Sequence, residues 1–173
     1  MLVRDWQGLI DAIDREIHRE ESPFRTGKRN PGATEQVIRA AERRLDFRFD
    51  PVYREYLTHV DGWVQFNAVE ASLYGLDELG APAWAGEQSI LAEWSREYRE
   101  VVVPLGMPDL SDMLLVGGSA QIGFYMLLVP PAASSAAGRV VELTDEPQIH
   151  ADFHAYLEKE LTFWKFCNEP EDD

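Results

Sequence analysis

The chain has little cysteine and no long apolar run. Cys167 is the one cysteine among 173 residues, so no disulfide can form within the chain, and such usage is typical of a reducing compartment. The longest strongly apolar run, 124–129, is far shorter than the roughly 20 residues that cross a bilayer. Acidic residues interrupt the apolar pattern of 1–16, where a secretory signal needs an uninterrupted apolar stretch. We therefore expect a cytoplasmic protein that does not span a membrane.

Positive charge is also scarce. The chain holds 16 Lys and Arg against 31 Asp and Glu, and its formal net charge is −15. The excess falls in residues 49–173, because residues 1–48 have a net charge of only +1. Nucleic-acid binding is disfavoured, since phosphate contacts need Lys and Arg. A basic protein partner is favoured, because opposite fields raise encounter rates. The alternative is that the charge only keeps the protein soluble.

No residue pattern marks a catalytic or metal centre. His150 and His154 are four residues apart, a spacing that lets two imidazoles on a helix share a metal. No third ligand is marked and the HExxH motif is absent, so we interpret both as surface histidines. Cys167 follows an aromatic turn that suits an inert thiol, and the glycines before Ser119 indicate a turn. We expect no enzyme, no cofactor and no metal; an enzyme of unrecognised type that uses His150 and His154 is the alternative, and stoichiometric zinc binding would support it.

The stretch from Pro31 to Trp63 predicts two short helices joined by a tight turn. Thr34 can cap the first helix, because its hydroxyl can accept from the unpaired amides of the first turn. Asp50 is a good N-cap for the second, and Pro51 at the first helical position loses no hydrogen bond. Gly62 is expected to end the second helix in the left-handed conformation. The apolar positions of the two helices are Val37, Ile38, Ala41, Leu45, Tyr53, Tyr56, Leu57 and Val60.

The rest of the chain alternates between helical and strand patterns. Residues 22–32 are expected to form a connector whose small basic patch (Arg25, Lys28 and Arg29) is solvated. Helices gathered before hairpin-linked strands favour an α+β fold with one mostly antiparallel sheet flanked by helices. We expect one domain over 1–168 and a solvated acidic tail over 169–173. Spacing predicts helices over 5–20, 89–99 and 149–166, and strands over 64–67, 71–75, 113–116, 122–129 and 138–143.

These motifs resemble the SMI1/KNR4 (SUKH) family. Its members carry a helix with an internal Glu and a Pro-x-x-Tyr-x-x-x-Leu helix, which here reads PVYREYL over 51–57 with Phe-Asp-Pro in place of the family's Leu-Pro. They also carry an Asn-Gly pair that is Asp-Gly in this chain. Their final helix carries a Phe-x-x-(Tyr/Phe)-Leu signal, which FHAYL at 153–157 matches. The corresponding fold positions are Glu42, Pro51, Tyr53, Leu57, Gly62 and Trp63.

The resemblance implies a protein-binding function without catalysis. Bacterial members commonly act as immunity proteins that neutralise a cognate toxin, often a nuclease, by covering its active or substrate-binding surface. An acidic chain suits this role, because carboxylates can take the place of phosphates on a basic surface. The alternative that the resemblance implies is a regulatory scaffold, as in fungal relatives linked to cell-wall synthesis. The residues leave the oligomeric state open.

Residues in or beside predicted loops are the candidates for partner contact. Trp84, in the predicted loop over 81–86, is the best candidate for an exposed aromatic anchor, because aromatics dominate binding hot spots. Solvated loop charge is the alternative for the acidic candidates. Glu42 could act in function, pair with Arg39 or Arg43, or fix the turn that follows it. The acidic candidates are Asp77, Glu78, Asp109 and Asp112.

Overall fold

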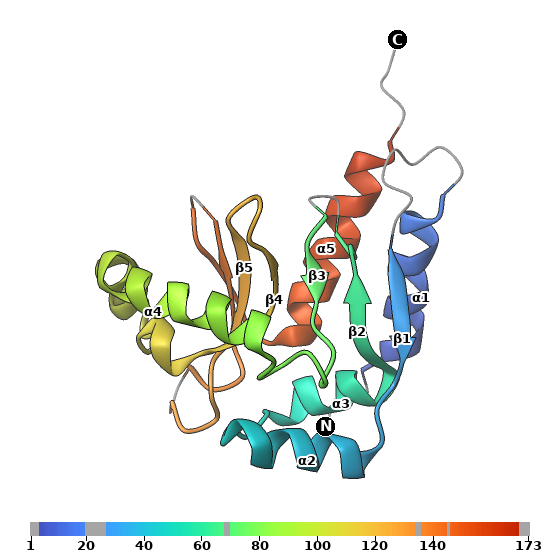
Figure 1. Cartoon of the computed structure of the whole chain (residues 1–173). Coiled ribbons are helices and arrows are strands. Elements are labelled where there is room, and N and C mark those ends of the chain that lie inside the picture. Colours follow the sequence, from blue (N-terminus) through green and yellow to red (C-terminus); the bar gives the residue numbers. More distant parts are fainter. Residues whose placement is uncertain (1–3, 20–26, 68–69, 134–135, 145, 170–173) are drawn as a thin grey trace.

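Within residues 4–19, 27–67, 70–133, 136–144 and 146–169, which the computed structural model describes, five helices pack against one seven-stranded sheet (Figure 1). The helices are α1 (Trp6–Ile17), α2 (Glu35–Leu45), α3 (Pro51–His59), α4 (Pro82–Val102) and α5 (Phe153–Cys167). The strands are β1 (Lys28–Pro31), β2 (Val60–Val64), β3 (Ser72–Leu73), β4 (Leu114–Ser119), β5 (Phe124–Leu128), β6 (Val140–Leu143) and β7 (Gln148–His150). Two 3-10 turns, η1 (Val103–Leu105) and η2 (Leu110–Asp112), follow α4.

The strands lie side by side in chain order from β1 to β7, and each neighbouring pair is antiparallel. Antiparallel neighbours can be joined by short connections and need no crossover helix. The α+β class with an antiparallel sheet flanked by helices is therefore confirmed.

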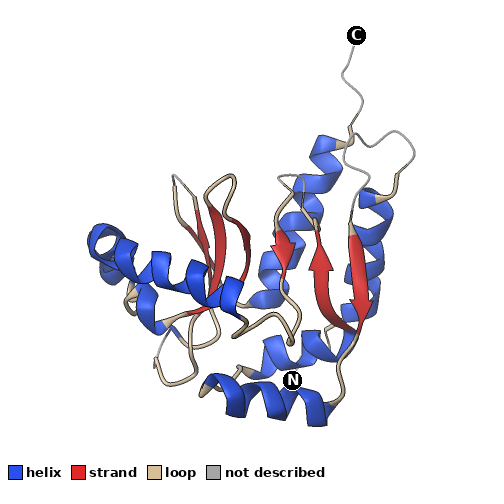
Figure 2. Cartoon of the chain, in the orientation of Figure 1, coloured by secondary structure: helices blue, strands red, loops and turns tan. Residues whose placement is uncertain are grey.

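Hydrophobic cores lie on both faces of the sheet, because successive side chains of a strand point to opposite faces. On β4, Leu114 and Val116 enter the core that α1, α3 and α5 cover, whereas Leu115 enters the core beneath α4. On β5, Met126 belongs to the first core and Tyr125 to the second. Figure 2 shows the consequence, since α4 lies on one side of the molecule, apart from α1 and α5.

The helices of the first core begin as the sequence predicts. Oγ1 of Thr34 accepts from the backbone N–H of Val37 at 3.4 Å, and Oδ1 of Asp50 accepts from that of Val52 at 2.8 Å. Pro51 occupies the first position of α3. The amphipathic pattern of α1 is also confirmed, since its apolar positions are buried. These are Trp6, Leu9, Ile10, Ile13 and Ile17.

Gly62 does not end α3, and the predicted helix stop at this position is wrong. The helix ends at His59, and Val60 opens β2 with extended backbone. Gly62 lies inside β2 with a φ of 92°, and a Cβ there would lie 2.8 Å from the backbone nitrogen of Gly75. Glycine is required here because φ is positive and the β3–α4 loop approaches so closely.

Helix α4 begins at Pro82, so the predicted loop over 81–86 and the predicted helix start at residue 89 are both wrong. Proline suits the first helical position, because the N–H that it lacks has no partner there. Ser89 lies inside the helix, and its hydroxyl donates to the carbonyl oxygen of Ala85 at 2.8 Å. Trp84 therefore lies on the first turn of a helix and not on a loop.

Strands β3 to β6 overlap the predicted strands, but other boundaries differ. Gly117 and Gly118 lie inside β4 and do not mark a turn. A Cβ at either position would come within 2.6 Å of a carbonyl oxygen on a neighbouring strand. Part of the predicted connector forms β1, and the start of the predicted last helix forms β7. Helix α5 begins after its N-cap Asp152, whose Oδ1 accepts from the backbone N–H of Ala155 at 2.9 Å.

In the described ranges, no helix is both long and apolar enough to cross a membrane. Two sequence predictions fall on residues outside those ranges. These residues are Arg25 of the basic patch and 170–173 of the acidic tail.

Candidate partner-binding surface

Glu42 fixes the turn between α2 and α3. Its Oε1 accepts from the backbone N–H of Phe49 at 3.0 Å, and its Oε2 lies 2.5 Å from Nη1 of Arg54. Of the alternatives that the sequence left open, the structure therefore selects the turn. The ion-pair partner is Arg54, and neither Arg39 nor Arg43 pairs with Glu42.

The other aromatic and apolar family positions serve the fold as well. Tyr53, Leu57 and Trp63 are at most 1% exposed and belong to the core that α1, α3 and α5 cover. The ring of Tyr53 contacts the ring of Phe153 on α5, with centroids 4.8 Å apart. Burial raises the pKa of the Tyr53 hydroxyl well above its ordinary value. These three side chains offer no surface to a partner.

Asp77 and Glu78 lie exposed on the loop between β3 and α4. Oε2 of Glu78 accepts from the backbone N–H of Gly75 at 2.7 Å, so part of this carboxylate stabilises the loop. Arg44 on α2 donates to two carbonyl oxygens of the same loop. The carboxylate of Asp77 makes no hydrogen bond or ion pair within the described residues, and it is open to solvent.

Asp109 and Asp112 lie at η2, beyond the other end of α4. Oδ1 of Asp109 lies 3.5 Å from Nε of Arg99, so Arg99 partly neutralises this carboxylate. Asp112 is exposed. Arg99 lies roughly 25 Å along the helix axis from the start of α4, where the Asp77 loop ends. The four predicted carboxylates therefore flank α4 and do not form one compact site.

Trp84 is not the exposed anchor that the sequence predicts. It is half-buried on the inner side of α4 and packs against both cores. Its Nε1 donates to the carbonyl oxygen of Leu115 on β4 at 2.8 Å. Gln88, one turn later, donates to the carbonyl oxygen of Met113 at 3.1 Å and accepts from the backbone N–H of Leu115 at 3.0 Å. The hydrogen bonds of Trp84 and Gln88 therefore hold the start of α4 against β4 and the residue before it.

Helix α4 exposes most of its surface to solvent. Of its 21 residues, only Leu91 and Val102 are fully buried. Ile90 is 38% exposed and Val101 is 43% exposed. Together with the half-buried Trp94, they follow spacings of four and seven residues and form one stripe along the helix.

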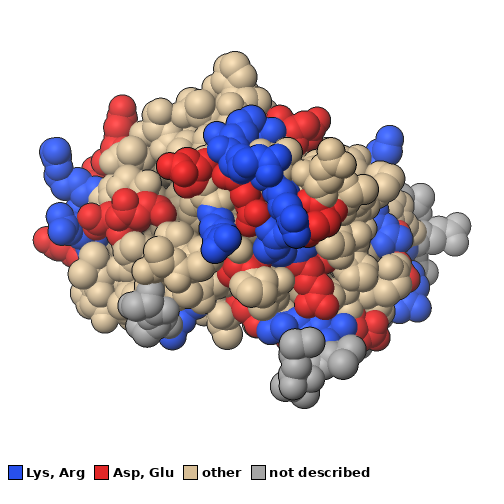
Figure 3. Space-filling model, turned by 90° about the horizontal axis from the view of Figure 1, so that it is seen from below, with Lys and Arg blue, Asp and Glu red and all other residues tan. Residues whose placement is uncertain are grey.

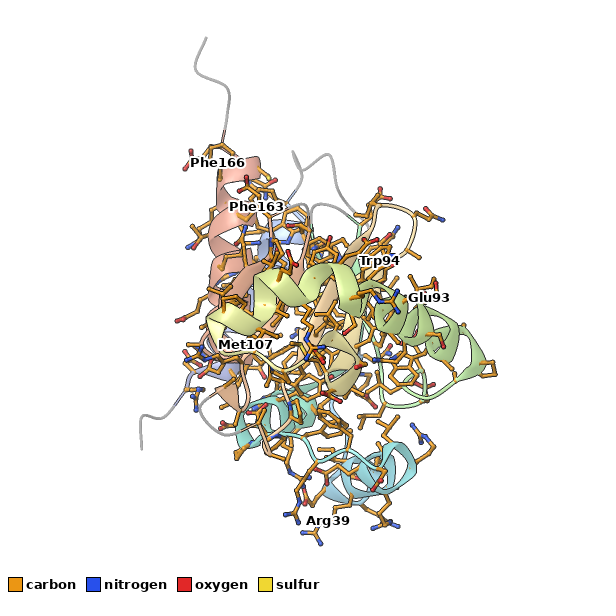
Figure 4. The ribbon with its side chains drawn as sticks, turned by 90° about the vertical axis from the view of Figure 1, so that its left-hand side faces the viewer. Arg39, Glu93, Trp94, Met107, Phe163 and Phe166 are labelled. Carbon is orange, nitrogen blue, oxygen red and sulfur yellow. The ribbon has the colours of Figure 1, made fainter. Side chains whose placement is uncertain are left out.

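Carboxylates border this apolar stripe. Glu93, Glu97 and Glu100 are exposed on α4, and Figure 4 shows Glu93 beside Trp94. Residues 55–138 contain eleven Asp and Glu but only two Lys and Arg, a local signal that could have drawn attention to this region from the sequence. The α4 surface, as we define it, consists of Ile90, Glu93, Trp94, Glu97, Glu100 and Val101.

His150 and His154 do not lie on one helix face, and neither is the surface histidine that the sequence predicts. His150 is on β7, and its Nε2 lies 3.0 Å from Oε2 of Glu142. His154 is on α5, and its Nδ1 lies 3.6 Å from Oε2 of Glu158. Their side chains are only 10% and 17% exposed. Among the described residues, no three or more His, Cys, Asp and Glu are grouped so that they could hold a metal ion.

A buried charge network joins β6 to α5. Nζ of Lys159 lies 3.0 Å from Oε1 of Glu142 and 2.8 Å from Oε1 of Glu160. Burial raises the pKa of Glu160 despite the attraction of Lys159. Burial also acts to raise the pKa of Glu142, but hydrogen bonds from His150 and Lys159 hold that pKa below its ordinary value. The opposite charges of this network hold α5 against the sheet.

Cys167 lies half-buried at the end of α5. Burial raises the pKa of its thiol, and the negative charge of Glu160 adds to this effect. A raised pKa disfavours the thiolate, which is the nucleophilic form. This environment fits the inert role that the sequence predicts.

Comparison with known proteins agrees with the motifs described above. No curated protein matches the chain. The model of the SMI1 / KNR4 family (SUKH-1) matches residues 32–159. This range includes the Glu42 turn, all of α2 to α4, strands β2 to β7 and the first part of α5. The chain therefore belongs to the SMI1/KNR4 family (SUKH-1).

Proposed function

We propose that this chain is a non-catalytic binding module, an immunity protein that neutralises a basic, nuclease-type toxin through the α4 surface. Family membership supports an immunity role. The observation that carries the proposal is the exposure of α4, a 21-residue helix with two fully buried residues. A long exposed helix that combines carboxylates with apolar side chains is suited to binding another protein.

Charge explains why the partner is expected to be basic. A nuclease surface attracts polyanions, and the carboxylates of Glu93, Glu97 and Glu100 can compete for the same cationic side chains. Opposite fields also raise the rate of encounter. A toxin covered in this way cannot bind its nucleic-acid substrate, so inhibition needs no chemical step.

The apolar stripe supplies contact area at the centre of the α4 surface. The ring of Trp94 packs edge-on against Tyr125, with centroids 5.6 Å apart, so its orientation is largely fixed before binding. A pre-organised aromatic loses little conformational entropy when it is buried by a partner. Flanking carboxylates extend the acidic field beyond both ends of α4, as a polar rim. They are Asp77, Glu78, Asp109 and Asp112.

Capture of the partner tests the proposal. The immobilised protein is incubated at low salt with lysate of its own source, and bound proteins are identified by mass spectrometry. We expect a basic protein that kills cells when it is expressed alone and is silenced by co-expression of this chain. Recovery of only signalling or wall-synthesis proteins would overturn the immunity function and favour the scaffold alternative.

A further inference from the structure

A hollow on the α2 side of the molecule gathers arginines, although the protein as a whole is acidic. Its volume is about 370 Å³, and it lies where α2 turns toward α3. A second hollow of about 640 Å³ adjoins it, because the two share Arg39, Glu42 and Arg48. The first hollow is lined by Arg39, Glu42, Arg43, Asp46, Phe47 and Arg48. We refer to it as the arginine hollow.

Two of these guanidinium groups have no partner among the residues that the structure describes. Arg43 and Arg48 are exposed, and neither makes a hydrogen bond or an ion pair with any residue that the structure describes. Arg39 pairs with Glu35, with Nε and Oε1 2.7 Å apart. Placing Arg43 four residues after Arg39 on one helix brings like charges together, which disfavours the helix by a few tenths of a kcal/mol. The Arg39–Glu35 ion pair and the position of Arg43 in the last turn of α2, where the helix dipole favours a cation, offset part of this repulsion.

The carboxylate of Glu42 does not neutralise the arginine hollow. Its two oxygens are used by the Phe49 N–H and by Arg54. Asp46, at the end of α2, is the one other carboxylate in the lining. The arginine hollow therefore keeps an excess of positive charge. Figure 3, which views the molecule from the side of α2, shows Lys and Arg side chains gathered near the centre of this face.

The turn that carries Arg48 is held in place. Besides the Phe49 contact, the backbone N–H of Phe47 donates to the carbonyl oxygen of Glu42 at 3.2 Å. The Arg48 guanidinium on this turn lines the same hollow as Arg39 and Arg43 on α2, and forked donors of this kind suit phosphate oxygens. The adjoining hollow adds apolar lining from Pro51 and Pro131, against which the body of a ligand could pack, and it also contains Glu35 and Arg54.

From these features we propose that the arginine hollow binds the phosphate groups of a small phosphorylated ligand, such as a nucleoside diphosphate, whose body occupies the adjoining hollow. The two hollows have volumes in the range of small-molecule sites. The net charge of −15 does not prevent binding, because the Debye length at physiological ionic strength is about 8 Å and the local arginines dominate. Figure 4 shows Arg39 far from Glu93 and Trp94, so the site is separate from the α4 surface.

Calorimetric titration of the full chain with inorganic phosphate, ADP and adenosine tests the proposal. We expect ADP to bind at least about tenfold more tightly than either of the others, since only ADP can occupy both hollows. Arg43→Gln with Arg48→Gln should weaken ADP binding at least about tenfold, because two charged hydrogen-bond donors are lost. Arg15→Gln with Arg96→Gln is the matched control, since it removes the same charge from exposed positions on α1 and α4.

A gain-of-binding variant makes the test sharper. Asp46 has a positive φ of 48°, which Asn tolerates well. Asp46→Asn removes the competing carboxylate without disturbing the turn, and we expect it to tighten ADP binding. No detectable binding of ADP, or an equal loss in the Arg15 and Arg96 control, would overturn the proposal. Chemical shifts of the backbone amides over 39–54 would report directly where the ligand lies.

Discussion

Oε2 of Glu42 lies 2.5 Å from Nη1 of Arg54, and this ion pair closes the turn between α2 and α3. The Glu42 side chain is 14% exposed and that of Arg54 is 24% exposed, so the pair is only partly screened by solvent. The hydrogen bond to Glu42 raises the pKa of Arg54 above its ordinary value. The internal Glu of the family motif thus acts in the fold of this chain.

Replacement of Glu42 should destabilise the protein. Glu42→Ala removes the ion pair and leaves the Phe49 N–H without its acceptor. We expect the free energy of unfolding to fall by about 2 kcal/mol, which lowers the melting temperature by roughly 4–8 °C in a chain of this size. Thermal unfolding followed by circular dichroism measures the effect.

Glu35→Ala is the control for this prediction. It removes a more exposed carboxylate, which pairs with both Arg54 and Arg39, and an exposed ion pair typically contributes only about 0.2–1 kcal/mol. Equal effects of the two variants would contradict the special role of Glu42.

Two glycines should respond in opposite directions to alanine. Gly62→Ala places a Cβ 2.8 Å from the backbone of Gly75 at a positive φ, so we expect a loss of about 1–3 kcal/mol in the free energy of unfolding. A Cβ at Gly86 meets no atom within 4 Å and lies inside α4. Gly86→Ala should therefore stabilise the protein by about 0.5–1 kcal/mol. Urea unfolding of both variants checks the pair, and stabilisation by Gly62→Ala would contradict the described approach of the β3–α4 loop.

Glu160 should make the protein more stable as pH falls from neutral. Burial raises its pKa, so the folded state holds this proton more tightly than the unfolded state does. The resulting stabilisation is complete below the ordinary pKa of Glu and is lost as pH rises through the raised value. Glu160→Gln removes this dependence. The free energy of unfolding of the variant, relative to that of the wild type, should therefore be greater at pH 7.5 than at pH 5. Urea unfolding at the two pH values measures this difference. A difference that does not change with pH would contradict the prediction.

Glu142 should behave in the opposite way. Despite burial, hydrogen bonds from His150 and Lys159 lower its pKa, so its stabilisation is present above the ordinary pKa of Glu and lost as pH falls through the lowered value. Glu142→Gln should lower the free energy of unfolding by about 2 kcal/mol at pH 7, because Lys159 and His150 lose a charged acceptor. The cost should shrink as pH falls through this lowered pKa, because the wild-type carboxylate is then protonated as well. A cost that does not change on acidification would contradict this assignment.

Local features of the fold could be predicted from the sequence, and features set by distant contacts could not. The caps at Thr34 and Asp50 depend on hydrogen bonds within one turn of the chain, and both are confirmed. Glycine is required at position 62 because Gly75 approaches closely, and Glu42 pairs with Arg54 and not with arginines nearer in the sequence. Neither contact could be predicted without the tertiary structure. Pro82 and Gly86 led to the prediction of a loop at the start of α4, because both residue types are common in loops. Proline also suits the first position of a helix, and only the structure shows that Pro82 occupies it.

The candidate site was harder to predict than the fold. The acidity and the lack of catalytic motifs were visible in the sequence, but the exposure of α4 depends on how this helix packs against the sheet. Trp84 illustrates the difficulty, since the sequence predicts an exposed anchor on a loop, whereas the indole is half-buried on a helix and donates a hydrogen bond to β4. The arginine hollow likewise arises because the turn brings Arg48 beside α2.

The most direct test of the account is the affinity of the captured partner for a charge-reversed α4 surface. Calorimetry at low salt compares the wild type with Glu93→Lys and Glu97→Lys combined, and with Glu55→Lys and Glu158→Lys combined as a control on the helices of the opposite sheet face. We predict that the α4 variant binds at least about tenfold more weakly, that the control binds nearly as the wild type does, and that wild-type affinity falls as salt rises. Unchanged binding by the α4 variant, or affinity insensitive to salt, would contradict the claim that this acidic helix recognises the partner.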